Sequence, residues 1–62
     1  MINPEPAVIK QSRKDAGLTQ TQAGAVVYST CRAWQKWEKG EARMHQAMFE
    51  LFLLKTGQQW KL

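Results

Sequence analysis

The sequence predicts an all-α fold, a compact four-helix domain that contains a helix-turn-helix, with a short C-terminal turn as an optional fifth element. Three observations support this class. Capping residues precede three of the expected helices, a glycine follows three of them, and apolar residues recur at helical rather than strand spacing. With 62 residues the chain has room for one domain, 1–62, whose core is small or is completed by a partner.

The first helix is expected from Pro4 to about Asp15. Asn3 would cap it, and Pro4 would take the first helical position, where a missing N–H costs nothing. Gly17 fits the left-handed position just past the end of such a helix. The side chains expected on its buried side are Val8, Ile9 and Ala16.

The second helix, about Gln20 to Val27, follows a capping box at 19–22. Oγ1 of Thr19 can accept from the backbone N–H of Gln22, while the Gln22 side chain returns to the N–H of Thr19. Gly24 lies inside this helix, where it costs about 1 kcal/mol relative to alanine. We therefore expect another segment to approach closely at Gly24.

A break at Tyr28 and Ser29 separates the second helix from the third. Ser29 or Thr30 would cap the third helix, which is expected to run to about Lys39 and to end at Gly40. Two short helices joined by so tight a connection are the layout of a helix-turn-helix.

The fourth helix is expected from about Met44 to Lys55, before a stop at Thr56-Gly57. It is apolar nearly all round, which is typical of a helix that is buried on more than one side. One stripe consists of Met44, Ala47, Met48, Leu51 and Leu54. Either the tail 58–62 or a second subunit would cover the other sides, and we favour a two-fold dimer. The predicted dimer contacts are Phe49, Phe52, Leu53, Trp60 and Leu62.

The charge balance indicates a polyanionic partner. Nine Lys plus Arg stand against five Asp plus Glu, which gives a net charge of +4 and a pI near 9.7. Nucleic acid and an acidic membrane surface both fit this balance. The sequence has no recognisable signal peptide, and its longest apolar run, LFLL at 51–54, is far too short to span a membrane.

Few residues are suited to catalysis or metal binding. Cys31 is the only cysteine, so an intramolecular disulfide is impossible, and one Cys with one His is too little for a structural zinc site. Such a chain suits a reducing compartment. No nucleophile–base pair, carboxylate pair or phosphate-binding loop is recognisable. We therefore expect no enzymatic activity, no cofactor and no metal.

Trp34 and Trp37 lie among cationic residues, and two arrangements would account for this pattern. In an amphipathic helix the two indoles share a buried face, and Arg32 and Lys36 point outward at i and i+4 spacing. Alternatively, the indoles form an exposed platform on which bases stack. We favour the buried arrangement, because with exposed rings nothing large would hold this helix to the body.

The stretch GLTQTQAGAVVYSTCRAWQKWEKGEARM resembles the helix-turn-helix domain of the Cro/C1 (XRE) repressor family, without a gap. The matching residues are Gly17, Leu18, Thr19, Gln20, Gly24, Val27, Thr30, Trp34, Trp37, Glu38 and Gly40. The departures are Tyr28 for the turn glycine, Ala23 and Ser12 for larger apolar residues, and Met44 for proline. At a positive φ, Tyr28 would be strained by roughly 1 kcal/mol or more. The two tryptophans would refill the lost core volume.

The resemblance implies a lambda-repressor-like fold whose third helix reads double-stranded DNA in the major groove. Arg32 has the bidentate geometry that suits guanine O6 and N7. The expected base-reading residues are Cys31, Arg32, Ala33, Gln35 and Lys36. The expected phosphate-binding residues are Thr19, Gln20, Thr30, Lys39 and Arg43. The resemblance also implies an ion pair between Glu38 and a basic residue of the first helix, with Arg13 as the obvious partner.

The expected function is that of a sequence-specific transcriptional regulator of the small phage or mobile-element type, in the cytoplasm of a bacterial or phage-infected cell. We expect a dimer that represses from an inverted-repeat operator and takes no small-molecule substrate. Two alternatives stay open. One is a protein-binding module, such as an antitoxin-like partner that uses the apolar fourth helix. The other is a single-strand or RNA binder that uses exposed Trp34 and Trp37.

Overall fold

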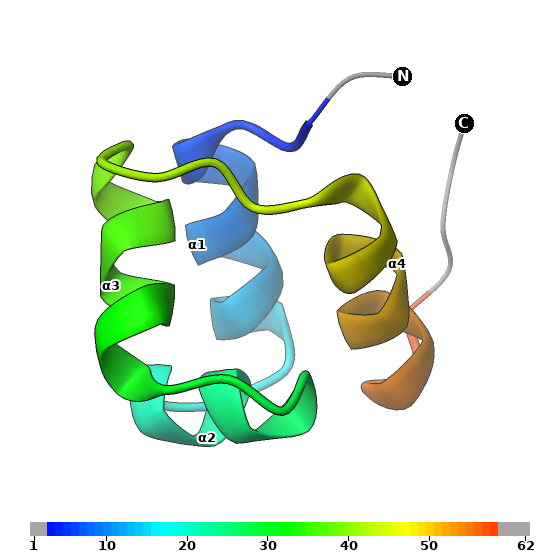
Figure 1. Ribbon diagram of the computed structural model, residues 1–62. Helices are drawn as coiled ribbons and strands as arrows, with labels where there is room; N and C mark the ends of the chain where they lie inside the picture. Colours follow the sequence, from blue (N-terminus) through cyan, green and yellow to red (C-terminus); the bar gives the residue numbers. More distant parts are fainter. Residues whose placement is uncertain (1–2, 59–62) are drawn as a thin grey trace.

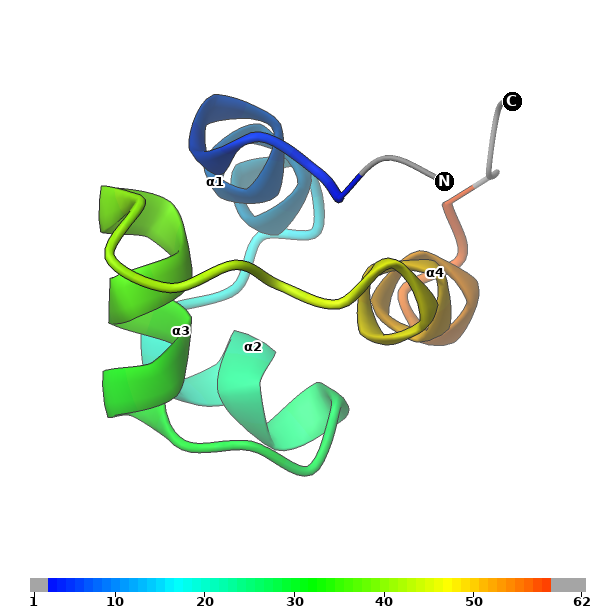
Figure 2. The ribbon, with the colours of Figure 1, turned by 45° about the horizontal axis from the view of Figure 1, so that its top comes forward.

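The computed structural model describes residues 3–58, which form four α-helices and no strand. These are α1 (Pro6–Asp15), α2 (Gln20–Val26), α3 (Cys31–Lys39) and α4 (Gln46–Lys55). α2 and α3 form the predicted helix-turn-helix, and α3 lies at one side of the molecule with the other helices all on the same side of it (Figures 1 and 2). The predicted all-α class is therefore confirmed. None of these helices is long and apolar enough to cross a membrane.

Helix α1 begins at Pro6, so the predicted start at Pro4 with an Asn3 cap is wrong. Glu5 is the N-cap residue, with extended backbone angles (φ −75°, ψ 152°) and no capping hydrogen bond from its side chain. The reason is steric, because the residue before a proline is disfavoured in the helical region. Glu5 precedes Pro6, and the helix therefore cannot extend back through it.

The buried side of α1 also differs from the prediction. Ile9 and Ser12 are buried, and Ala16 packs against the edge of the core. Val8 is 44% exposed, so its predicted place in the core is wrong. Ile9, Ser12 and Ala16 follow the helical i, i+3, i+7 spacing, and Val8 lies off this face.

The caps of the helix-turn-helix follow the prediction. The Thr19 hydroxyl accepts from the N–H of Gln22 at 3.1 Å, and the Thr19 N–H donates to the Gln22 side chain at 2.9 Å. The Thr30 hydroxyl accepts from the backbone of α3 in the same way. Gly40 ends α3 in the left-handed conformation (φ 79°). Helix α2 ends at Val26, one residue before its predicted end.

The turn between α2 and α3 places Tyr28 at a φ of 59°, a left-handed conformation that strains a residue other than glycine. The tyrosine is exposed, and its hydroxyl accepts a hydrogen bond of 2.7 Å from Nζ of Lys55 at the end of α4. Nζ of Lys55 also donates to the carbonyl of Val26 at 3.1 Å and lies 3.9 Å from the centre of the Tyr28 ring. The hydrogen bond and the positive charge of Lys55 lower the pKa of Tyr28. These contacts of Lys55 hold the turn against the end of α4.

The absent side chain of Gly24 permits the close approach that we predicted. A Cβ at this position would lie 2.8 Å from the carbonyl oxygen of Thr30 and 3.0 Å from its carbonyl carbon. The Gly24 carbonyl also accepts from the N–H of Ser29 at 2.8 Å, so the turn is held against α2. The close neighbour is backbone, which cannot rotate away as a flexible side chain would.

Replacing Gly24 with alanine is expected to lower the free energy of unfolding by about 2 kcal/mol, because forcing a methyl group into a filled space outweighs the better helix propensity. Urea unfolding followed by circular dichroism measures the change. Thr21→Ala, at an exposed position on the same helix, is the control and is expected to stay within about 0.5 kcal/mol of the parent. A Gly24→Ala variant as stable as the parent would contradict the close contact.

The predicted stripe coincides only in part with the core-facing side. Met44 is buried in the core and Met48 and Leu51 pack against it, whereas Ala47 and Leu54 are exposed, Leu54 by 71%. Phe49, Phe52 and Leu53 are buried in the core of the single chain. A dimer interface through Phe49, Phe52 and Leu53 is therefore wrong, because a second copy cannot reach side chains that one chain already covers. Trp60 and Leu62, the other two predicted dimer contacts, lie outside the described residues.

The two indoles of α3 fill the centre of the core, as predicted. Trp34 is 0% exposed and Trp37 is 8% exposed. The Trp34 ring lies 5.6 Å from that of Trp37 in an edge-on arrangement, and 4.9 Å from the Phe52 ring of α4. One large side chain thus bridges α3 and α4.

Candidate nucleic-acid interface

The outward side of α3 brings four of the five predicted base-reading residues together. Arg32 and Lys36 are exposed, and Cys31 and Gln35 are partly exposed. These side chains line a shallow depression, here called the α3 hollow, which consists of Cys31, Arg32, Gln35, Lys36, Lys39 and Glu41. No other part of the described chain lies over this side of α3 (Figures 1 and 2).

The helix geometry explains why the cations point outward. Trp34 and Trp37 are fixed in the core, and in a helix this directs the residues two positions before each of them, Arg32 and Gln35, toward the opposite side. Lys36 follows Arg32 at i+4 spacing and shares that side. The alternative in which Trp34 and Trp37 form an exposed stacking platform is wrong, since neither ring is available to a base.

Ala33 does not belong to the α3 hollow. It is partly buried and packs against the hydrophobic core, and its backbone N–H donates to the Thr30 hydroxyl. Ala33 lies one position before Trp34 and therefore on the flank of the buried face. Ala33 is exposed to the same intermediate degree as Cys31 and Gln35, and its place on the base-reading surface stays a prediction.

Three predicted phosphate ligands are accessible around α3. Thr19 and Thr30 are exposed caps, and each uses an oxygen lone pair for its helix while its hydroxyl hydrogen stays free to donate. Lys39 is exposed and lies in the α3 hollow. These positions can donate to phosphate, and their role as phosphate ligands stays a prediction.

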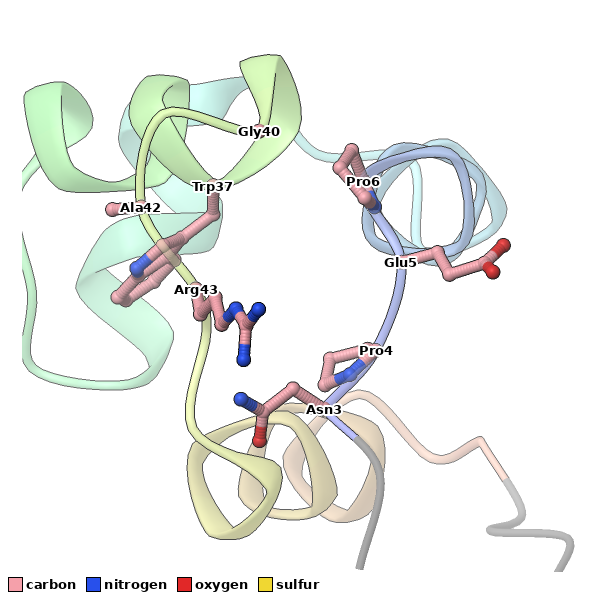
Figure 3. A pocket seen from close by; sticks show the side chains of 8 residues that line it. All are labelled: Asn3, Pro4, Glu5, Pro6, Trp37, Gly40, Ala42 and Arg43. Carbon is pink, nitrogen blue, oxygen red and sulfur yellow. The ribbon is translucent and has the colours of Figure 1, made fainter.

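Arg43 lies in a second depression, between the loop after α3 and the segment before α1. Its guanidinium group points into this depression toward the amide of Asn3, and the ring of Trp37 and Pro6 form part of the walls (Figure 3). The carboxylate of Glu5 points away from it (Figure 3). Arg43 is exposed and remains a candidate phosphate ligand at the end of α3.

Gln20 has a structural partner that sequence reasoning did not foresee. Its side-chain amide donates to Oε1 of Glu38 at 3.1 Å, so it links the first turn of α2 to α3. The predicted phosphate contact of Gln20 would have to use the second hydrogen of the same amide group. Gln20 thus supports α3 from the side.

Glu38 is the centre of a network that joins three helices. The predicted ion pair with Arg13 of α1 is present, with Nε 2.6 Å from Oε2, and the side chains are 15% (Arg13) and 6% (Glu38) exposed. The indole N–H of Trp34 donates to the same carboxylate oxygen, and Gln20 donates to the other. A second nitrogen of Arg13 donates to the carbonyl of Leu18 at 3.1 Å. Arg13 is therefore a structural residue here.

The environment of Glu38 keeps it ionised. Burial raises its pKa, but the hydrogen bonds from Arg13, Trp34 and Gln20 and the positive charge of Arg13 outweigh this effect. The net result is a pKa below the ordinary value of 4.5. The carboxylate therefore holds α1, α2 and α3 in register near neutral pH, and it fixes the orientation of the α3 hollow.

Glu41 is the residue of the hollow that sequence reasoning missed. It is an exposed acidic residue on a surface that was expected to be cationic, and it was assigned no role. The signal in the sequence was its position directly after Gly40. A helix that ends in a left-handed glycine turns the chain back, so the next residue lies beside the last turn of the helix.

The comparisons with known proteins give one partial similarity. No family model matches the chain. The type II methyltransferase M.MspI of a Moraxella species is 36% identical to this chain over 45 residues. These residues make up 73% of this chain and 11% of the methyltransferase, so the similarity covers a small part of a much longer protein.

Proposed function

We propose that this domain binds double-stranded DNA sequence-specifically and acts as a transcriptional regulator of the Cro/C1 (XRE) type. The observation that carries the proposal is the two-sided construction of α3. Its indoles are buried, and Arg32, Lys36 and Lys39 are exposed together on the side that no other described segment covers. A helix of this diameter fits the major groove, and its cations match the acceptors of guanine and the phosphates beside it.

The proposed interface makes two kinds of contact with DNA. Arg32 donates two hydrogen bonds to O6 and N7 of guanine, and Lys36 serves the same acceptors as a point charge. Gln35, beside them, has both a donor and an acceptor for a neighbouring base. Lys39 and Arg43 at the end of α3 and the caps Thr19 and Thr30 hold phosphates and set the register. The regulator represses by occupying its operator.

Selection of bound sites from random double-stranded DNA tests the proposal most directly. We expect the protein to enrich one short sequence that contains guanines in the positions facing α3, with binding that weakens steeply as salt is raised. Enrichment of no sequence at moderate salt would reject the proposal. Recovery of single-stranded DNA or RNA in preference to the duplex would also reject it.

Arg32→Ala is expected to weaken binding to the selected site by about tenfold to a hundredfold and to relax the preference at one base pair. A gel shift or fluorescence anisotropy titration at fixed salt measures this loss. The combined Arg32→Ala and Lys36→Ala variant is expected to lose most of the specificity.

The matched control for this double variant is Lys10→Ala with Lys14→Ala, which removes two exposed cations from α1. We expect this control to lower the affinity for all sequences slightly through net charge while it keeps the base preference. If both pairs of substitutions act alike, the sequence is read by residues other than those of the α3 hollow.

We further propose a two-fold dimer, with a different contact from the one first predicted. Leu54 is the large apolar side chain of α4 that is most exposed, and Ala47 and the partly buried Leu51 lie on the same side of the helix. Two copies joined there would present two α3 helices to half-sites one DNA turn apart, roughly 34 Å. An inverted repeat in the selected sites supports the dimer, and a single unrepeated half-site argues for a monomer.

The other proposed functions have less support. An antitoxin-like module that docks through an apolar α4 loses most of its surface, because Phe49, Phe52 and Leu53 are buried. In our proposal the chain itself has no catalytic role and works in the cytoplasm, at the nucleoid. The similarity to a small part of a type II methyltransferase is compatible with this, because a domain of this size can form part of a longer protein as well as act alone.

A further inference from the structure

We infer that Glu41 determines specificity at the DNA interface by accepting a hydrogen bond from the N4 amino group of a cytosine. The inference rests on the proposed function and adds an anionic acceptor to a surface whose other charged side chains are all donors. The motivating observation is that Glu41 lines the α3 hollow together with Arg32, Lys36 and Lys39.

The backbone holds Glu41 against α3. Gly40 adopts a left-handed conformation (φ 79°) and turns the chain back over the end of the helix. The N–H of Glu41 then donates to the carbonyl of Lys36 at 2.9 Å, within the last turn of α3. A residue anchored in this way keeps a fixed position relative to the base-reading side chains when α3 enters a groove.

The carboxylate of Glu41 is not used inside the described part of the protein. Among residues 3–58 the only salt bridge joins Arg13 and Glu38, and Glu41 forms no side-chain hydrogen bond there. Within the hollow it therefore remains an exposed negative charge beside three cations. A surface that only bound phosphate would be weakened by such a charge, because the two anions repel each other.

The hydrogen-bonding groups on the base edges include a partner for the Glu41 carboxylate. A carboxylate only accepts hydrogen bonds, whereas the arginine and lysines of the hollow only donate them. In the major groove, guanine offers the acceptors O6 and N7, and cytosine offers the N4 amino donor. Adenine also has an amino group there, but its neighbouring N7 acceptor would face the carboxylate unfavourably. The hollow therefore matches both members of G·C pairs, with Glu41 on cytosine.

The test compares site selection by the parent protein, by Glu41→Ala, which removes the acceptor, and by the control Glu5→Ala. Both variants lose one exposed negative charge, but Glu5 lies before α1 with its carboxylate directed away from the Arg43 depression (Figure 3). Glu41→Ala is expected to lose about tenfold of the preference for cytosine at one position of the site. Glu5→Ala is expected to select the parental sequence.

A second measurement uses the selected duplex with N4-methylcytosine at that position, since the methyl group replaces the amino hydrogen that faces the groove. The modification is expected to weaken binding by the parent about tenfold and to leave Glu41→Ala unaffected. If Glu41→Ala binds every sequence more tightly and keeps the parental preference, Glu41 only repels phosphate and the inference is wrong. A parent protein that enriches no sequence instead refutes the proposed function itself.

Discussion

Trp34→Ala is expected to leave the domain unfolded at 25 °C. Removing a fully buried tryptophan costs about 3–5 kcal/mol, and a domain of this size rarely has more than about 3–5 kcal/mol of stability in total. Trp34 is 0% exposed and packs on both Trp37 and Phe52, so its removal leaves a cavity in the core. The loss of the helical circular dichroism signal measures the outcome.

Trp34→Phe separates packing from hydrogen bonding at the same position. Phenylalanine keeps an aromatic ring against Phe52 but cannot donate to Glu38 as the indole N–H does. We expect this variant to fold, with a free energy of unfolding lower by about 2 kcal/mol, from the smaller ring and the lost donor. An alanine variant that stays folded with a melting temperature near that of the parent would show that Trp34 does not form the core.

The orientation of α3 was predictable from sequence because its two sides differ chemically. Only Trp34 and Trp37 are large and apolar, and they share a face at i, i+3 spacing. The sequence therefore identifies a single side of this helix as the buried one. The sequence of α4 does not identify its buried side, because this helix is apolar on nearly every side. The contact between Phe52 and Trp34 decides which side of α4 faces the core, and this depends on the packing of two helices distant in sequence.

Local backbone rules predicted the caps and turns. The capping box at Thr19 and the cap at Thr30 each depend on a few neighbouring residues. The conformation of Tyr28 was left open by the sequence, and the structure gives it a φ of 59°. The start of α1 depends on an equally local rule, the effect of Pro6 on Glu5, which the choice of Pro4 as the first helical residue overlooked.

The candidate site was predictable in outline, and its supporting contacts were not. The exposure of Arg32 and Lys36 follows from the helix, and the pair between Arg13 and Glu38 was implied by the family resemblance. The donors Gln20 and Trp34 were not foreseen, because their hydrogen bonds to Glu38 depend on side-chain rotamers and on how α2 crosses α3. Such contacts have no periodic signature in the sequence.

Glu38→Gln is expected to lower the free energy of unfolding by about 3 kcal/mol, because removing one member of a buried ion pair leaves the other charge uncompensated. Arg13, which is 15% exposed, is the charge left behind. Adding Arg13→Met removes that charge as well, and we expect the double variant to recover at least about 1 kcal/mol relative to Glu38→Gln alone. Chemical denaturation of the parent, of Glu38→Gln, of Arg13→Met and of the double variant measures the coupling free energy between the two side chains.

The acid sensitivity of the parent tests the same network in another way. The pKa of Glu38 is lower in the folded chain than its ordinary value, so near that value the unfolded chain binds more protons than the folded one. The stabilisation from Glu38 is therefore complete above the ordinary value of 4.5 and is lost as the pH falls through the lower folded pKa. Between about pH 5 and pH 3 we expect the melting temperature of the parent to fall more steeply than that of Glu38→Gln, which cannot titrate at this position. Parallel melting curves for the two proteins over this range would mean that Glu38 is not held ionised by its three donors, and its role in fixing α3 would then be wrong.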